Sequence, residues 1–380
     1  MDTVCTESGS YKLNSTSIFC SNPSIENNLI SAEISKAVHN VLASGTFILG
    51  EEVANFESEF ASYLNAEFCI GVNSGTDALV IGLKALGIGA GDEVIMPSHT
   101  AVATAAAVVA TGATPVFAEV SSFSMTIDPN SVETLVSVRT RAIIAVHLYG
   151  FPCDLDELQQ ICKNKGIFLI EDCAQAHGAE YKGKKVGTIG QIGCFSFYPT
   201  KNLGAVGDGG AIVTNNRELS EKCFALRQYG WDSSRVSNFN STVSRLDEIQ
   251  AAILRVKLNR LQQNNNRRIE IAGHYRASLD SDSVELPKEP QQGKHVYHHF
   301  VIRVSNRDHM IEILNKRSIF PGIHYPKPAH MHPAFGAFTQ NARISLKYTE
   351  ELSNTILSLP MYPEMTETEI NRVVEGVKSV

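Results

Sequence analysis

The sequence predicts an α/β protein with a mostly parallel central sheet flanked by helices, followed by a smaller C-terminal α/β domain. Three observations support this prediction. Short runs rich in Val, Ile and Phe alternate with amphipathic helical segments between about residues 70 and 215. The short runs are apolar throughout rather than alternating, which is typical of strands that are buried on both faces. After about residue 245 a long helical stretch begins and the pattern changes.

Six short runs are expected to be buried strands of the sheet. Each contains β-branched or aromatic residues and lies next to turn-forming residues. In chain order they are DEVIMPS (92–98), ATPVFAEV (113–120), RAIIAVHLYG (141–150), GIFLIEDCAQA (166–176), GCFSFYP (193–199) and GGAIVTN (209–215). Because the carboxyl ends of parallel strands lie at one edge of a sheet, functional residues are expected there.

The segments between the strands have the spacing of helices that cover the sheet. In CDLDELQQICKNKG, Leu155, Leu158 and Ile161/Cys162 share one face, and Gly166 is expected to end the helix. Strands that alternate with such helices predict βαβ units and hence a mostly parallel sheet.

The second half of the chain predicts a smaller α/β unit. A long helix is expected over residues 245–279, and HVYHHFVIRV (295–304) and RDHMIEILNKRSI (307–319) follow it as a strand and a helix. The helix is expected to connect two lobes. We therefore predict an N-terminal lead-in over residues 1–28, a large domain over 29–260 and a small domain over 261–380.

The composition argues against several classes of protein. The 380 residues carry a net charge of -7, which gives no support to binding of nucleic acid or an acidic membrane surface. The N-terminus lacks the pattern of a secretory signal, and the longest apolar run, residues 101–110, is too short to span a bilayer. The eight cysteines are scattered without a C-x-x-C pair. A cytoplasmic protein with no metal site is expected.

Asp172 closes the apolar run IFLIED and is the first candidate site residue. A carboxylate at the end of a buried strand is costly unless it meets a cation or several hydrogen-bond donors. It could cap a helix or lie at a sheet edge, or it could pair with a buried positive group such as a protonated ring nitrogen. Asp172 alone does not decide between these alternatives.

SGTDALVIGLKALG (74–87) reads as a helix introduced by small polar residues. The first backbone N–H groups of a helix lack partners within it and form an anion site together with the helix dipole. Ser74, Gly75 and Thr76 could therefore bind a phosphate, although an ordinary helix cap explains the same residues.

Lys201 follows the strand that carries Ser196, after a break at Pro199, and it precedes four glycines at 204, 207, 209 and 210. The segment does not have the spacing of a nucleotide P-loop. Lys201 could be a surface charge or a lysine that forms a Schiff base in a site of low polarity. A phosphate site, a strand-end carboxylate and such a lysine together match the needs of pyridoxal phosphate.

Five segments of the chain resemble the sugar aminotransferases of the DegT/DnrJ/EryC1/StrS family. They are SGTDAL (74–79), EDCAQAHGA (171–179), FSFYPTKNLGAVGDGGAI (195–212), SRLDEIQAAIL (244–254) and GIHYPKPAHMHPAF (322–335). The resemblance runs from about residue 44 to residue 370. It implies a fold-type I, aspartate aminotransferase-like enzyme that uses pyridoxal phosphate. It also implies a homodimer with active sites at the interface and nucleotide-linked keto-sugars as substrates.

The resemblance also implies roles for individual residues. Lys201 would form the Schiff base and then act as general base and acid, and Asp172 would pair with the pyridinium nitrogen. The remaining expected contacts are Gln175 near the ring, Ser196, Gly75 and Thr76 at the phosphate, and His324 and Tyr325 facing the substrate.

Two positions depart from the family pattern. Ala101 stands where an aromatic residue often stacks on the cofactor ring, so stacking is expected to fall to His99 or to be weaker. Val243 stands where an asparagine commonly reaches the phosphate of the partner subunit. Asn238 or Asn240 is the candidate to replace it, and we include Asn240 among the expected cofactor contacts.

The expected reaction is amino transfer from glutamate to a keto-deoxysugar, with pyridoxamine phosphate as the intermediate form of the cofactor. LRQYGW (226–231) and residues 322–335 resemble members that aminate C3 of a sugar carried on dTDP. Amination at C4 is the direct alternative. A pyridoxamine-phosphate sugar dehydratase would carry histidine in place of Lys201, and a non-catalytic regulator would not need Lys201, Asp172 and Ser196 together.

Overall fold

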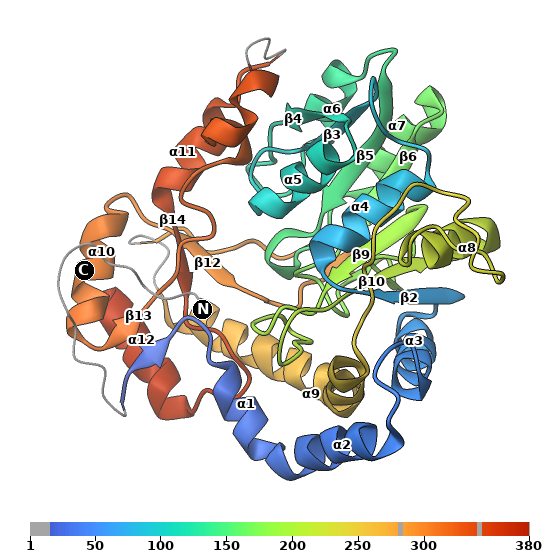
Figure 1. Cartoon of the computed structure of the whole chain (residues 1–380). Helices are drawn as coiled ribbons and strands as arrows, with labels where there is room; N and C mark the ends of the chain where they lie inside the picture. The colour runs from blue at the N-terminus through green and yellow to red at the C-terminus, as the bar shows by residue number, and fades with distance from the viewer. Residues whose placement is uncertain (1–15, 280–283, 340–343, 380) are drawn as a thin grey trace.

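A seven-stranded sheet forms the centre of the protein in the computed structural model, which describes residues 16–279, 284–339 and 344–379 (Figure 1). In sheet order the strands are β2 (Phe68–Val72), β10 (Gly210–Thr214), β9 (Ile192–Ser196), β6 (Phe168–Asp172), β5 (Thr140–Val146), β3 (Glu93–Pro97) and β4 (Thr114–Ala118). Only β10 runs antiparallel to its neighbours in this sheet. The predicted mostly parallel sheet is confirmed, and each of the six expected runs overlaps one of its strands; β2 was not predicted.

Both faces of the sheet are covered, as the unbroken apolar strands predicted. Ile143 and Ile144 are neighbours in β5 yet belong to different hydrophobic cores, because successive side chains point to opposite faces. One face packs against α4 (Gly75–Ala85), α5 (Val102–Ala110) and α8 (Arg217–Leu226). The other packs against α3 (Glu51–Leu64), α6 (Pro129–Leu135), α7 (Leu155–Lys165) and the first half of α9 (Glu248–Ser278). The helix expected over 153–166 is α7, and Gly166 ends it in the left-handed conformation.

The C-terminal part of the chain forms a third core around a two-stranded antiparallel ribbon, β12 (Phe300–Arg303) and β14 (Ile356–Leu359). Its helices are α10 (Arg307–Lys316) and α12 (Glu367–Lys378), whereas α11 (Lys347–Thr355) packs Leu352 into the core on one face of the large sheet. The helix α9 passes from one core to the other, since Leu254 packs under the large sheet and Ile271 packs in the third core. The expected boundary at residue 260 therefore falls inside α9, and the domain limits stay a prediction.

The N-terminal segment is attached to this third core. β1 (Ile18–Phe19) pairs with β13 (Ile319–Phe320), and α1 (Pro23–Leu29) and α2 (Ser31–Ser44) follow it. Residues 1–15 of the expected lead-in lie outside the described residues. The remaining short elements are β7 (Glu180–Tyr181), β8 (Lys184–Lys185), β11 (Gly293–Lys294), and the 3₁₀ turns η1 (Leu148–Gly150), η2 (Ala329–Met331) and η3 (Pro333–Phe338). Within the described ranges no helix is long and apolar enough to cross a membrane.

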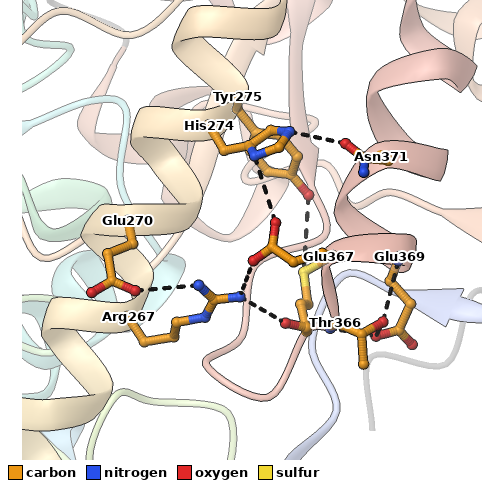
Figure 2. Close-up of polar contacts among 9 residues, drawn as sticks. Arg267, Glu270, His274, Tyr275, Thr366, Glu367, Glu369 and Asn371 are labelled. Atoms are coloured by element: carbon orange, nitrogen blue, oxygen red, sulfur yellow. Dashed lines mark hydrogen bonds and ion pairs between the residues drawn. The ribbon is translucent and has the colours of Figure 1, made fainter.

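Polar contacts between α9 and α12 line the outer edge of the third core (Figure 2). Arg267 donates to Glu367 at 2.8 Å, and the His274 ring lies 3.0 Å from Oδ1 of Asn371. Thr366 closes a capping box at the start of α12. The Arg267 and Glu367 side chains are partly exposed, so this pair adds little to stability and the apolar packing beneath it holds the helices together.

Two contacts hold the C-terminal part against the sheet beside the edge where functional residues were expected. The Glu119 carboxylate, just after β4, accepts the backbone N–H groups of Tyr348 and Thr349 at 3.0 Å each, at the start of α11. Oγ of Ser98, just after β3, lies 2.5 Å from Nδ1 of His330 in η2. The chain between β13 and α11 is therefore held to the sheet at His330 and again at the start of α11.

Candidate active site

A cavity of about 300 Å³ lies at the carboxyl ends of β6 and β9. It brings together residues from the start of α4, the ends of both strands, the loop after β9 and the C-terminal part of the chain. Its lining residues are Ser74, Gly75, Thr76, Leu79, Ala101, Ala103, Asp172, Ala174, Ser196, Tyr198, Thr200, Lys201, Asp208, Gly209, His298, His299, His324 and Tyr325. Eight of the eleven site residues expected from the sequence thus meet in one place.

The start of α4 and the end of β9 lie close together in the lining of the cavity. Ser74 caps α4 by accepting the N–H of Asp77 at 3.1 Å, which leaves the N–H groups of Gly75 and Thr76 at the first turn. A Cβ placed on Gly75 would lie 2.6 Å from Cβ of Ser196, so only glycine allows this approach. Two helix N-terminal amides beside a serine hydroxyl are donors suited to a phosphate group, and the residues present fit the phosphate of pyridoxal phosphate.

Asp172 ends β6 and is buried, with one hydrogen bond to each carboxylate oxygen. Oδ1 accepts the N–H of Ala174 at 3.1 Å, and Oδ2 accepts the hydroxyl of Thr104 at 3.0 Å. Burial raises the pKa of Asp172 above its ordinary value, although these two bonds and the positive charge of Lys201 act in the opposite direction. A cationic N–H group placed beside this carboxylate would stabilise its ionised form.

Lys201 lines the cavity from a tightly folded loop. Its backbone N–H donates to the carbonyl of Tyr198 at 2.8 Å, and the next residue, Asn202, donates from Nδ2 to Asn265 at 2.9 Å. A Cβ on Gly204 would lie 2.4 Å from the carbonyl oxygen of Pro199, so the chain folds back on itself directly after the lysine. This close approach is the reason for a small residue at Gly204.

Four residues from the C-terminal part form the wall opposite the sheet: His298, His299, His324 and Tyr325. The rings of His299 and His324 stack at 3.8 Å between centroids with an interplanar angle of 16°. Burial and the neighbouring imidazoles and Lys201 lower the pKa of His298 and His299 well below the ordinary value. Both rings are therefore neutral near pH 7, and they add no charge beside Lys201.

Gln175 connects this wall to the sheet without lining the cavity. Its Nε2 donates to the hydroxyl of Tyr325 at 2.9 Å, and its Oε1 accepts the N–H of Tyr149 at 2.7 Å. The hydroxyl of Tyr149 in turn donates to the carbonyl of His324. The expected contact of Gln175 with the cofactor ring stays a prediction, and its visible contacts position Tyr325.

His99 and Asn240 also lie outside the lining of the cavity. His99 is fully buried with Nε2 2.7 Å from the Tyr149 hydroxyl, and burial lowers its pKa to about 4. Asn240 lies exposed in the loop between α8 and α9, beside Val243. Ala101 does line the cavity. The cofactor roles expected for His99, Ala101 and Asn240 stay predictions.

The sequence predicted no role for His298, His299 or Thr104. The two histidines stand in the run HVYHHF, and a pair of adjacent histidines at the start of an apolar strand was the available signal. Thr104 lies four residues after Thr100 in α5, behind Asp172, and nothing in the local pattern separates it from an ordinary buried threonine.

Two groups of side chains have atoms close enough to hold a metal ion, among the residues described. In Cys20, His299 and His324 the two rings are stacked, so their in-plane lone pairs do not converge on one ion. In His147, Glu171 and Cys173 the carboxylate already accepts backbone N–H groups from the segment 187–190. We assign a metal to neither group.

Comparison with known proteins gives close matches over nearly the whole chain. The model of the DegT/DnrJ/EryC1/StrS aminotransferase family matches residues 28–378. A dTDP-3-amino-3,6-dideoxy-alpha-D-galactopyranose transaminase from Aneurinibacillus thermoaerophilus is 46% identical over 91% of this chain and 94% of its own. A dTDP-3-amino-3,4,6-trideoxy-alpha-D-glucose transaminase from Streptomyces venezuelae is 43% identical over 91% and 92%. The crystal structure of S. venezuelae DesV with a ketimine intermediate has a TM-score of 0.93 and 41% identity, and it covers 96% of this chain and 98% of that one.

Gly75→Ala is expected to weaken binding of pyridoxal phosphate by about tenfold or more, because the added Cβ forces the start of α4 away from Ser196. The dissociation constant is measured by titrating the apo-protein with the cofactor and following its absorbance. Gly273→Ala is the matched control, since a Cβ there meets nothing within 4 Å. Equal affinity of Gly75→Ala and the wild type would contradict the assignment of the phosphate end.

Proposed function

The chain belongs to the DegT/DnrJ/EryC1/StrS aminotransferase family, and from this premise we propose that it transfers the amino group of glutamate to C3 of a dTDP-linked keto-deoxysugar. It is a pyridoxal-phosphate-dependent transaminase of the aspartate aminotransferase-like fold. The observation that carries the proposal is the meeting of Lys201, Asp172 and the first turn of α4 around one cavity. The C3 position and the dTDP carrier are taken from what the two named transaminases act on.

Pyridoxal phosphate supplies an aldehyde that reacts with amines and a ring that withdraws electrons from the bond being broken. In the proposed site the N–H groups of Gly75 and Thr76 and the hydroxyl of Ser196 bind the phosphate. Asp172 holds a proton at the ring nitrogen, which keeps the ring electron-poor. These contacts fix the two ends of the cofactor.

Lys201 is proposed to do two things in sequence. Its amine would hold the cofactor covalently when no substrate is bound. Once substrate has displaced it, Nζ would take a proton from the substrate carbon that bears the amine and return it to the carbon of the cofactor. The neutral imidazoles of His298 and His299 lie on the opposite wall and leave the lysine without a cationic imidazole beside it. Both steps require the uncharged amine, which a site of low polarity favours.

His324 and Tyr325 are proposed to contact the substrate from the C-terminal wall. Both line the cavity, and each is held by a second residue, His324 by the Ser358 hydroxyl at 2.9 Å and Tyr325 by Gln175. A side chain with a fixed orientation loses less entropy when it binds a ligand. The wall is therefore suited to discriminate between sugars that differ in the place of a keto group or hydroxyl.

A homodimer is part of this proposal. Large apolar side chains are exposed around α2 and the turn after it, where Leu42 is 56% and Phe47 49% exposed, and in the loop before α9, where Val236 is 56% and Phe239 43% exposed. Burying such side chains against a second copy is favourable. The exposed position of Asn240 in the same loop fits the expectation that it serves the partner subunit's site.

Light scattering of the purified protein is expected to give about twice the chain mass of 41.5 kDa. A paired substitution of exposed apolar residues, Phe47→Ser with Phe239→Ser, is expected to shift the population toward the single-chain mass. A wild-type protein that scatters as one chain at working concentration would rule out the dimer.

Borohydride reduction after incubation with pyridoxal phosphate is expected to attach the cofactor to Lys201, as read by peptide mass spectrometry. Lys201→Ala is expected to lose this attachment and at least about a hundredfold of turnover, because the proton-transfer group is gone. It should still bind pyridoxamine phosphate. Lys316→Ala is the control, because it removes an exposed lysine that does not line the cavity. Attachment elsewhere, or normal turnover without Lys201, would refute the assignment.

A panel of nucleotide-linked keto-sugars tests the substrate. With glutamate as donor, the dTDP-linked 3-keto-6-deoxysugar is expected to react fastest and to give a product with its new amine at C3, as read by NMR. The panel includes 4-keto and UDP-linked compounds, and aspartate and alanine as alternative donors. An amine at C4 would identify the alternative regiochemistry, and failure of glutamate to donate would overturn the donor assignment.

A further inference from the structure

Two threonine hydroxyls lie in line behind the carboxylate of Asp172. Oγ1 of Thr104 donates to Oδ2 of Asp172 at 3.0 Å, and Oγ1 of Thr100 lies 3.0 Å from Oγ1 of Thr104. All three side chains are buried, with exposed fractions of 2% for Thr100, 1% for Thr104 and 6% for Asp172. Resting on the function proposed above, we propose that Thr100 and Thr104 form a hydroxyl relay that orients and polarises Asp172 toward the ring nitrogen of the cofactor.

The direction of the relay follows from counting protons. An ionised carboxylate only accepts hydrogen bonds, and each threonine hydroxyl has one proton to donate. Thr104 uses its one proton to donate a hydrogen bond to Asp172. The hydrogen bond between the two threonines is therefore donated by Thr100. Each hydroxyl in such a chain is polarised by the one before it, which strengthens the final bond to the carboxylate.

The relay has a rigid support. Thr104 lies in the first turn of α5, and Thr100 lies just before that helix with its hydroxyl 3.0 Å from that of Thr104. The other carboxylate oxygen of Asp172 is held by the N–H of Ala174. Asp172 is thus fixed from two sides, and it keeps acceptor capacity toward the cavity that it lines.

Few other groups help to keep Asp172 ionised. Lys201 and His147 carry the positive charges that act on it, and the nearby thiols Cys173 and Cys194 give no such support, since burial raises the pKa of both. Glu171, the preceding residue of β6, is engaged by His147 and backbone N–H groups. Removing the Thr104 hydroxyl therefore removes one of a small number of contacts that oppose the cost of burial. Thr104 is a positioning residue, because it acts on the cofactor only through Asp172.

The test compares Thr104→Val, Thr104→Ser and Thr100→Val as full-length protein loaded with pyridoxal phosphate. The main readout is the pH titration of the visible absorbance of the bound cofactor, and the second is its dissociation rate. Without the Thr104 hydroxyl, Asp172 would hold the proton on the ring nitrogen less tightly, and the ring would carry less positive charge. The nitrogen that links Lys201 to the cofactor would then keep its own proton up to a higher pH. Thr104→Val is expected to raise the pH midpoint of this absorbance titration by about half a pH unit or more.

The variants are expected to form a graded series. Thr100→Val should shift the midpoint in the same direction by less, and Thr104→Ser should titrate like the wild type because the hydroxyl is restored. Thr104→Val should also release the cofactor faster. Thr214→Val is the matched control: Thr214 is 2% exposed and its hydroxyl donates to the carbonyl of Gln191 at 2.8 Å, on a different strand from Asp172.

Three results would overturn the relay. One is a Thr104→Val midpoint equal to that of the wild type and of Thr214→Val. Another is an equal shift in Thr104→Ser and Thr104→Val, which would point to packing rather than the hydroxyl. The third is a Thr100→Val protein indistinguishable from wild type, which would end the relay at Thr104. A wild type that takes up no cofactor at Lys201 would instead refute the proposed function itself.

Discussion

The burial of the Asp172 carboxylate is the constraint on which the rest of the site depends. A charged group at the end of a strand covered on both faces is stable only if donors and a cation surround it. The N–H of Ala174, the hydroxyl of Thr104 and the charge of Lys201 do this from three directions. Because β6 lies in the middle of the sheet, the hydrogen-bond donors and positive charges that stabilise Asp172 must come from α5, the loop after β9 and the cofactor.

The elements that could be predicted are those whose signal is local. The buried strands follow from unbroken apolar runs, and Asp172 and Ser196 follow from their places at strand ends. Lys201 became meaningful only in combination with them, because a lysine in a loop has many explanations. Resemblance to a family then indicated one kind of enzyme, a sugar aminotransferase, and the match to the family model confirmed this family.

The residues that sequence reasoning missed are those whose role depends on tertiary packing. His298 and His299 enter the cavity from a part of the chain that belongs to another core, and no periodicity links them to Lys201. Thr104 faces Asp172 only because α5 packs over the sheet in this register. His99 was expected to contact the ring because Ala101 is not aromatic; its side chain lies against Tyr149, and the contact with the ring stays a prediction.

The glycine at 210 has a consequence for how such a protein diverges over time. A Cβ there would lie 2.4 Å from the backbone carbonyl of Ser74, and backbone cannot move aside as a flexible side chain can. A side chain at this position would therefore push the start of α4 away from β10, whatever sugar is used. The wall made by residues 298–299 and 324–325 is formed by side chains rather than by a close backbone approach. New substrate preferences can arise there by ordinary substitution while the phosphate end is inherited intact.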